Sequence, residues 1–322
     1  MALTTVPVAP WIEGFQPFDH TSVRRTEVVR PAMCGHNSLL VGQIGDWTWD
    51  AVAQVCGTDV LRAASRTGEP AYLSFYYYRV RSSPSFHLRT PTFGDRLHVT
   101  SQLFDFGSES VLTLHRISLL AGVGGFGPDE FYSGTDKDCL YVENLNRWIS
   151  RPDDGSNRRL VPASPPDFRH HHLPPLPEAY SPRHACHRAR TRLTFLDGDD
   201  LDRLEPAGPP VELEYRVDPS RDLNGVGLLY FAAYFSIVDW GLLQLWRGLG
   251  RNSRSFLERV VVDQQLCYLG NADADSAVRV SVQRREAVTG DRGHEVVDVV
   301  LRDRADGRLL AVCTLRLLAN PR

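Results

Sequence analysis

MCGHNSLLVGQIGDWTWDAVAQVC, residues 33–56, decides the fold because a polar turn runs directly into one long apolar helix. Asn37 and Ser38 are residue types that cap helix N-termini, and apolar residues recur after them at mostly helical spacing. Gly57 is expected to end the helix by adopting the left-handed backbone conformation that commonly follows the last helical turn. The rest of the chain is expected to form a sheet around this helix.

Two glycines, Gly42 and Gly45, lie inside the predicted helix. Each costs about 1 kcal/mol of helix stability against alanine. We therefore expect a close-packed neighbour or a ligand to approach the helix backbone at these positions. The free amides at the helix start are a suitable site for a developing negative charge.

The strands around the helix follow one order, which the chain repeats. Alternating or aromatic runs predict first-half strands at residues 22–30, 71–81, 96–106, 110–120 and within 130–149. The second half is predicted to contain a strand at 211–217, a helix at 222–246, and strands at 256–268, 278–286, 295–302 and 309–318. Gly-Asp-Trp at 45–47 is echoed by Val-Asp-Trp at 238–240.

This duplication predicts an α+β double hot-dog fold, with two repeats that each wrap an antiparallel sheet around one long central helix. The two hot-dog domains are expected at residues 1–149 and 191–322. A Pro- and His-rich linker at 150–190 joins them and is expected to be pinned across a surface. Ligand sites would then form between the halves.

The linker also carries a cluster of residues that bind metals in other proteins. They are His170, His171, His172, His184 and Cys186. Their spacing matches no zinc pattern, and consecutive histidines cannot all face one ion. A solvated linker without a metal is therefore predicted.

Composition narrows the range of functions. The chain has 42% hydrophobic residues and a formal charge of −3, so it has no overall basic field for nucleic acid. The first twenty residues lack both a basic start and a continuous apolar core, so neither a signal peptide nor a membrane span is predicted. Six irregularly spaced cysteines indicate reduced thiols, and we expect a cytoplasmic protein.

Three runs resemble one known family. They are PAMCGHNSLLVGQIGDWTWD at 31–50, YLSFYYYR at 72–79 and DLNGVGLLYFAAYFSIVDW at 222–240. Together they resemble the LnmK family, the bifunctional acyltransferase/decarboxylases of leinamycin-type polyketide biosynthesis. The resemblance implies a double hot-dog enzyme that takes methylmalonyl from coenzyme A, decarboxylates it and loads propionyl on an acyl carrier protein. It implies a coenzyme A thioester as substrate, with no metal or organic cofactor.

The resemblance also implies that a tyrosine hydroxyl accepts the acyl group. Strand alternation in residues 71–81 places Tyr72, Tyr76 and Tyr78 on one face and Tyr77 on the other, more apolar face. We predict Tyr72 as the nucleophile and Tyr76 as the second candidate for this role. Tyr76 is also predicted to bind the substrate. Tyrosine has a normal pKa near 10, so this role needs an activating neighbour. The alternative is that these rings only stabilise the strand and fill the core.

At the helix start, Gly35, His36, Asn37 and Ser38 are the predicted site residues. Amides of Gly35 and Asn37, or the Asn37 side chain, would hold the thioester oxygen, while His36 would donate a proton or a hydrogen bond and Ser38 would contact the substrate. The pattern is one residue shorter than the Gly-His-x-Asn of other hot-dog thioester enzymes. Which of these groups donate hydrogen bonds to the thioester oxygen therefore stays open. Helix capping and local turn bonds are the structural alternative.

Two other functions stay open. One is a plain hot-dog thioesterase or dehydratase, although the sequence shows no carboxylate paired with His36. The other is a non-catalytic protein that binds acyl carriers.

Asp222 and Asn224 at the second predicted helix are expected to be caps, so a single active site is expected at the first helix. Linker arginines, among them Arg188, could meet an acidic carrier or coenzyme A phosphates, and a homodimer is a possible assembly.

Overall fold

The computed structural model describes residues 15–121, 124–134, 136–151, 155–288 and 293–318. The first fourteen residues, where no signal peptide is expected, lie outside the described residues. Within the described ranges, no helix has both the length and the apolar character needed to cross a bilayer.

The first long helix, α1, runs from Asn37 to Cys56. Gly57 ends it with φ +68°, and the Gly57 amide donates to the carbonyl of Ala53 at 3.0 Å, which confirms the predicted stop. The prediction that Asn37 and Ser38 cap this helix was wrong, because His36 is the N-cap. Asn37 is already helical, and its side chain is buried.

The second long helix, α5, runs from Phe231 to Gly248. The prediction that it begins at residue 222 was wrong, because polar side chains hold residues 222–230 in a loop. The Asp222 carboxylate accepts from the Tyr215 hydroxyl at 2.8 Å, and Asn224 Oδ1 accepts from the amide of Leu228 at 3.0 Å. Asp and Asn side chains compete with helical hydrogen bonds in this way.

The described residues form a 13-stranded antiparallel sheet. Its first-half strands are β1 (Phe15–Pro17), β2 (Ser22–Val28), β3 (Tyr72–Arg81), β4 (Arg96–Asp105), β5 (Ser110–Ser118), β6 (Cys139–Ser150) and β7 (Val161–Pro162). Its second-half strands are β8 (Leu204–Pro206), β9 (Val211–Arg216), β10 (Val261–Tyr268), β11 (Ala277–Ala287), β12 (His294–Asp303) and β13 (Leu309–Leu318). The strand order is β1-β2-β4-β5-β6-β3-β10-β13-β12-β11-β8, with β7 beside β6 and β9 beside β11.

Short helices complete the fold. They are α2 (Pro128–Ser133), α3 (Pro182–Arg192), α4 (Gly198–Arg203), α6 (Ser253–Leu257) and the 3-10 helices η1 (Pro31–Met33), η2 (Asn157–Arg159) and η3 (Glu178–Tyr180). The strand predicted within residues 130–149 is confirmed by β6, which α2 precedes. The beginning of the strand predicted at 256–268 was wrong, because α6 occupies it. The predicted hairpin of residues 96–106 and 110–120 is confirmed by the pairing of β4 with β5.

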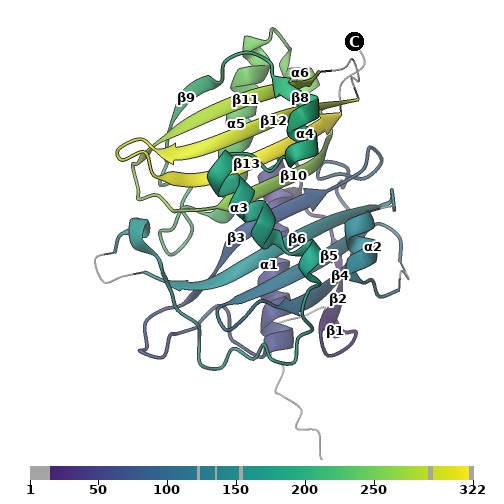
Figure 1. Cartoon of the computed structure of the whole chain (residues 1–322). Coiled ribbons are helices and arrows are strands. Elements are labelled where there is room, and N and C mark those ends of the chain that lie inside the picture. Colours follow the sequence, from purple (N-terminus) through teal and green to yellow (C-terminus); the bar gives the residue numbers. More distant parts are fainter. Residues whose placement is uncertain (1–14, 122–123, 135, 152–154, 289–292, 319–322) are drawn as a thin grey trace, which may run out of the picture.

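The two halves share one plan, and the predicted double hot-dog architecture is confirmed. Strand, long helix and four strands occur as β2-α1-β3-β4-β5-β6 and again as β9-α5-β10-β11-β12-β13. The halves join where β3 pairs with β10 in antiparallel register, with Tyr78 opposite Leu266. The central helices α1 and α5 lie on one face of this sheet, while α3 crosses the other face (Figure 1).

A β-bulge in β3 changes which tyrosines face α1. The register with β6 shifts between Phe75 and Tyr77. Beyond this bulge Tyr78 faces the helix, and its hydroxyl lies 3.4 Å from the carbonyl oxygen of Val41. Tyr77 instead turns to the opposite face, which α3 covers. The predicted alternation is therefore wrong from the bulge onward, because an extra residue reverses the faces of the strand.

Polar residues lie buried between α1 and the first-half sheet. His115, from β5, bridges the hydroxyl groups of Thr48 and Ser101 at 2.9 and 2.7 Å. Asn144 of β6 donates to Thr48 Oγ1 at 2.6 Å. Burial, followed by the charge of Arg25, lowers the pKa of His115 to about 3, so this imidazole is neutral.

The second half has an apolar surface at the equivalent positions. When Tyr78 and Leu266, which pair across the junction, are taken as equivalent, the strand registers relate Asn144 to Cys313 and His115 to Leu301. Both second-half residues are buried in the apolar cluster that includes α5. Thr113, which faces Asn144 across the strands, corresponds in the same way to Val299. The duplicated sheets therefore share a topology but not the polarity of their inner faces.

Candidate functional site

The start of α1 borders a small hollow between the two halves. Its lining residues come from α1, β3, β10 and the segments flanking these strands, and are Asn37, Val80, His87, Leu88, Arg89, Arg259, Val261 and Gln264. Its free volume is about 10 Å³, which is room for roughly one water molecule. His87, Leu88 and Arg89, from the segment after β3, line it together with Asn37.

Asn37 has an unsatisfied polar atom at this hollow. Only 3% of the residue is exposed, and Oδ1 has no hydrogen-bond partner among the described residues. Gln264 lies beside it and likewise has a buried Oε1 without a partner in the described parts of the chain. Buried polar atoms normally have a partner, so these two side-chain oxygens are available to accept hydrogen bonds from a donor.

Two guanidinium groups line the same hollow, and the charge of one of them, Arg259, is offset by Asp239. Arg259 donates to Asp239 Oδ1 at 2.6 Å and to the carbonyl of Phe256 at 2.7 Å. Arg89 faces it, and burial together with the charge of Arg259 lowers the pKa of Arg89. Burial and the Arg89 charge also lower the pKa of His87, which favours a neutral imidazole. A negatively charged group would be stabilised by Arg89 and the helix amides.

A short hydrogen-bonded chain connects the helix start to α5. His36 Nδ1 lies 2.5 Å from Ser38 Oγ, and Ser236 of α5 donates to the same oxygen at 2.8 Å. Gly35 has φ +130°, a conformation that favours glycine, and it turns the chain into this arrangement. The structure therefore brings Gly35, His36, Asn37 and Ser38 together at one end of α1.

Tyr72 lies at the other end of β3. Val80 borders the hollow, and Tyr72 precedes it by eight extended residues, which corresponds to roughly 25 Å. Tyr72 pairs with Ile149, and two residues further on Arg151 donates to the carbonyl of Val226 in the loop before α5 at 2.6 Å. The structure does not bring Tyr72 together with the α1 start within one chain.

Tyr76 lies on the face of the sheet that α3 covers. Its hydroxyl accepts from Arg190 of α3 at 3.1 Å. Burial is the main cause that raises its pKa. This tyrosine is therefore separated from both the α1 start and the α5 loop by the sheet or by the length of β3.

The histidines of the linker are spread over two places. His170 Nδ1 lies 2.9 Å from Asp105 Oδ1, and the His170 ring packs against His171 at 4.0 Å between centroids. His184 lies on α3, where its Nε2 is 3.4 Å from the Glu178 carboxylate. Their observed contacts are with neighbouring carboxylates and rings.

Sequence reasoning missed the charged partners of the α1 start. Arg89 lies in a segment without a recognisable motif, and Arg259 comes from the other half of the chain. The pairing of β3 with β10 places Arg259 beside Asn37. The sequence did predict that ligand sites form where the two halves meet, but this prediction did not identify single residues such as Arg89 and Arg259.

The comparisons with known proteins agree with this architecture. Residues 24–197 match the LnmK N-terminal Hot Dog Fold domain. The solved 12:0-ACP thioesterase from Umbellularia californica is 14% identical with a TM-score of 0.52, covering 92% of this chain and 93% of that one. An acyl-ACP thioesterase from Bacteroides thetaiotaomicron is 10% identical with a TM-score of 0.50, covering 92% and 97%. No curated protein matches the chain in sequence.

The two solved structures show the shared fold alone, because their identity to this chain is low. The domain match adds the family, and it covers most of β2, all of α1 and strands β3 to β7. It confirms the resemblance seen in the sequence motifs. Because this match spans more than half of the 322 residues, the protein belongs to the LnmK hot-dog family.

Proposed function

We propose that the protein is a decarboxylating acyltransferase that takes methylmalonyl from coenzyme A and delivers propionyl to an acyl carrier protein. Family membership supports acyl-thioester chemistry. The observation that carries the proposal is the start of α1, where Asn37 borders the same hollow as the guanidinium groups of Arg89 and Arg259. Such a site suits a substrate that gains negative charge during the reaction.

In the decarboxylation step, the bond between the α-carbon and the carboxylate breaks and carbon dioxide leaves. The electron pair moves toward the thioester carbonyl and forms an enolate, whose oxygen would lie against the first-turn amides of α1. The α-carbon then takes a proton, for which His36 is the nearest candidate donor. The segment at residues 82–95 must move before a thioester can enter this closed hollow.

In the transfer step, the Tyr72 oxygen would attack the acyl carbon and displace the coenzyme A thiolate, giving an acyl-tyrosine. The carrier thiol would then take the acyl group and release the tyrosine. Because roughly 25 Å of β3 separates Tyr72 from Val80 at the hollow, the two steps are predicted to respond to different substitutions.

Intact-protein mass spectrometry with methylmalonyl coenzyme A tests this function. Wild type should gain a propionyl-sized adduct that moves to an added carrier protein, and Tyr72→Phe should lack the adduct. Tyr76→Phe is the matched control on the same strand. If coenzyme A is released without any adduct, and release persists in Tyr72→Phe, the protein is a hydrolase and the proposal fails. If thioester affinity is retained but neither carbon dioxide nor coenzyme A is released, it is a non-catalytic binder.

A further inference from the structure

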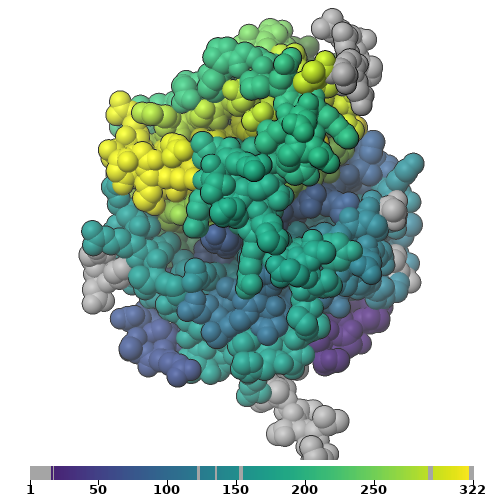
Figure 2. Space-filling view, in the orientation of Figure 1, coloured from purple at the N-terminus to yellow at the C-terminus, as the bar shows by residue number. Residues whose placement is uncertain are grey.

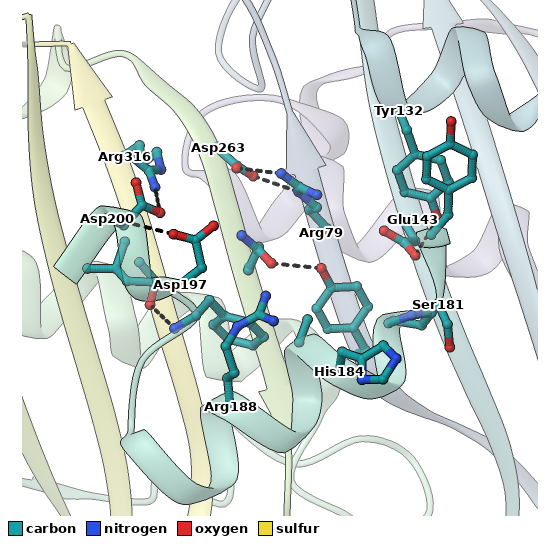
Figure 3. Close-up of a pocket in the computed structure, with 18 of the residues that line it drawn as sticks. Arg79, Tyr132, Glu143, Ser181, His184, Arg188, Asp197, Asp200, Asp263 and Arg316 are labelled. Atoms are coloured by element: carbon teal, nitrogen blue, oxygen red, sulfur yellow. Dashed lines mark hydrogen bonds and ion pairs between the residues drawn. The ribbon is translucent and has the colours of Figure 1, made fainter. Parts of the chain in front are cut away.

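A second cavity lies on the face of the sheet opposite α1. Its free volume is about 410 Å³, within the range of small-ligand sites. Strands β3 and β6 of the first half and β10 and β13 of the second form its floor, and α3 covers it (Figure 3). In the space-filling view, the teal linker segments lie across both halves above this region (Figure 2). The cavity is independent of the function proposed above.

Most charges in the cavity are already paired. Arg79 of β3 donates to both carboxylate oxygens of Asp263 on β10, at 2.9 and 2.8 Å. Arg316 of β13 forms an ion pair with Asp200 of α4. These two pairs are neutral overall and leave no charge for a ligand to balance.

Glu143 of β6 is the unpaired acid. Only 2% of the residue is exposed, and Tyr132 donates to its Oε1 at 2.7 Å. No cationic side chain of the described chain lies within ion-pair distance of it. Burial raises its pKa to about 7, despite the favourable charge of Arg79. A buried carboxylate without a cation is costly, so a positively charged ligand group would be stabilised beside it.

Arg188 of α3 is the unpaired base. It lines the cavity, its Nε is buried, and that atom has no hydrogen-bond partner among the described residues. Figure 3 shows its side chain at the cavity, across from Glu143. Asp197, the remaining acid of the lining, is exposed and accepts the Asp200 amide at 2.9 Å as the cap of α4.

We propose that this cavity binds a small zwitterion of the amino-acid class, with its ammonium at Glu143 and its carboxylate at Arg188. A ligand with one charge would leave the opposite protein group unpaired, whereas a zwitterion satisfies both. The ring of Tyr132 stacks on Tyr180 at 4.3 Å, and both rings line the wall where the ammonium would lie. Aromatic walls favour an ammonium group through their π faces.

Isothermal titration calorimetry of the full chain tests the proposal. The probes are glycine, β-alanine and γ-aminobutyrate, which place the two charges at increasing separations. Propionate and propylamine carry one charge each and serve as controls. We expect at least one zwitterion to bind at least ~10-fold more tightly than either control, because each charge-assisted contact adds affinity.

Substitutions assign the binding to this cavity. Glu143→Gln keeps the shape and the hydrogen bond to Tyr132 but removes the charge, and Arg188→Gln removes the opposite charge. Each should weaken zwitterion binding by at least ~10-fold. Arg192→Gln, at the exposed end of α3, should leave binding unchanged.

Three results would overturn the proposal. They are the absence of zwitterion binding in the millimolar range, equal binding of propionate or propylamine, and unchanged binding in both cavity variants. Arg188 is half-buried on a surface helix, so Arg188→Gln tests the site even if Glu143→Gln alters folding. None of these measurements uses a thioester, so failure of this proposal is separate from failure of the acyltransferase proposal.

Discussion

The ring of Phe231 occupies the space that a side chain on Gly45 would need. A Cβ built on Gly45 would lie 2.1 Å from Phe231 Cζ, and the ring itself stacks on Phe75 at 4.1 Å. Glycine at this position therefore lets the first turn of α5 pack directly on the middle of α1. This is the close-packed neighbour that the helix glycines predicted.

Gly45→Ala should destabilise the protein by about 1–3 kcal/mol, because the added methyl must displace a stacked ring. Gly42→Ala is the matched control. Its Cβ would lie 3.0 Å from the Tyr230 hydroxyl, and the gain in helix propensity offsets part of that contact. Urea denaturation of both variants measures the difference. Equal stability of the two variants would contradict the packing argument.

Asn37→Ala should lower kcat/KM for decarboxylation by roughly 10²–10³, because the substitution removes Nδ2, the side-chain group that would donate to the developing oxyanion. Release of carbon dioxide from methylmalonyl coenzyme A measures it. Tyr72→Phe should leave this release intact while it abolishes the acyl adduct. If Tyr72→Phe instead stops carbon dioxide release and Asn37→Ala does not, the reaction occurs at the α5 end of β3.

Glu143 should make the protein less stable as the pH rises. Its folded pKa is raised to about 7 from 4.5, so between these values the folded state keeps a proton that the unfolded state has lost. Stability therefore falls from pH 4.5 to 7 and stays lower above pH 7. Glu143→Gln should stabilise the protein at pH 8 by up to about 3 kcal/mol, with the gain lost by pH 5. A gain that is equal at both pH values would show that the ionised carboxylate is not its cause.

His115 should have the opposite effect on stability and make the protein less stable as the pH falls. Its folded pKa is about 3 against 6.5 for the free side chain, so below pH 6.5 the unfolded state takes up a proton that the folded state refuses. Stability is therefore full above pH 6.5 and declines toward pH 3 by up to about 5 kcal/mol. His115→Gln should flatten this acid limb in denaturation curves measured from pH 4 to 7. An unchanged slope would mean that other groups cause the acid sensitivity.

The architecture could be predicted because it depends on patterns that lie close together in the sequence. The helix that ends at Gly57 and the strands after it follow periodicity and turn signals, and their repetition revealed the two halves. The start of α5 was missed because Asn224 uses its side chain to hold a loop, although the same residue type favours helix caps. The reversal of Tyr77 and Tyr78 was missed because a bulge leaves no periodic signal.

The site was predictable only in part. The local run from Gly35 to Ser38 does converge at the α1 start, because neighbours in sequence remain neighbours at a helix end. Arg259 could not be assigned to it, because its approach to Asn37 depends on long-range strand pairing. Whether Tyr72 is the nucleophile stays a prediction for the mass-spectrometric test.

The unequal polarity of the two inner faces has a genetic consequence. In an assembly of two identical subunits, a substitution enters both copies at once because symmetry repeats it. In this fused chain, His115 arises once, and Leu301 at its counterpart position keeps an apolar core. A substitution that only one half can accommodate, such as a buried histidine, can therefore be present in the first half without entering the second.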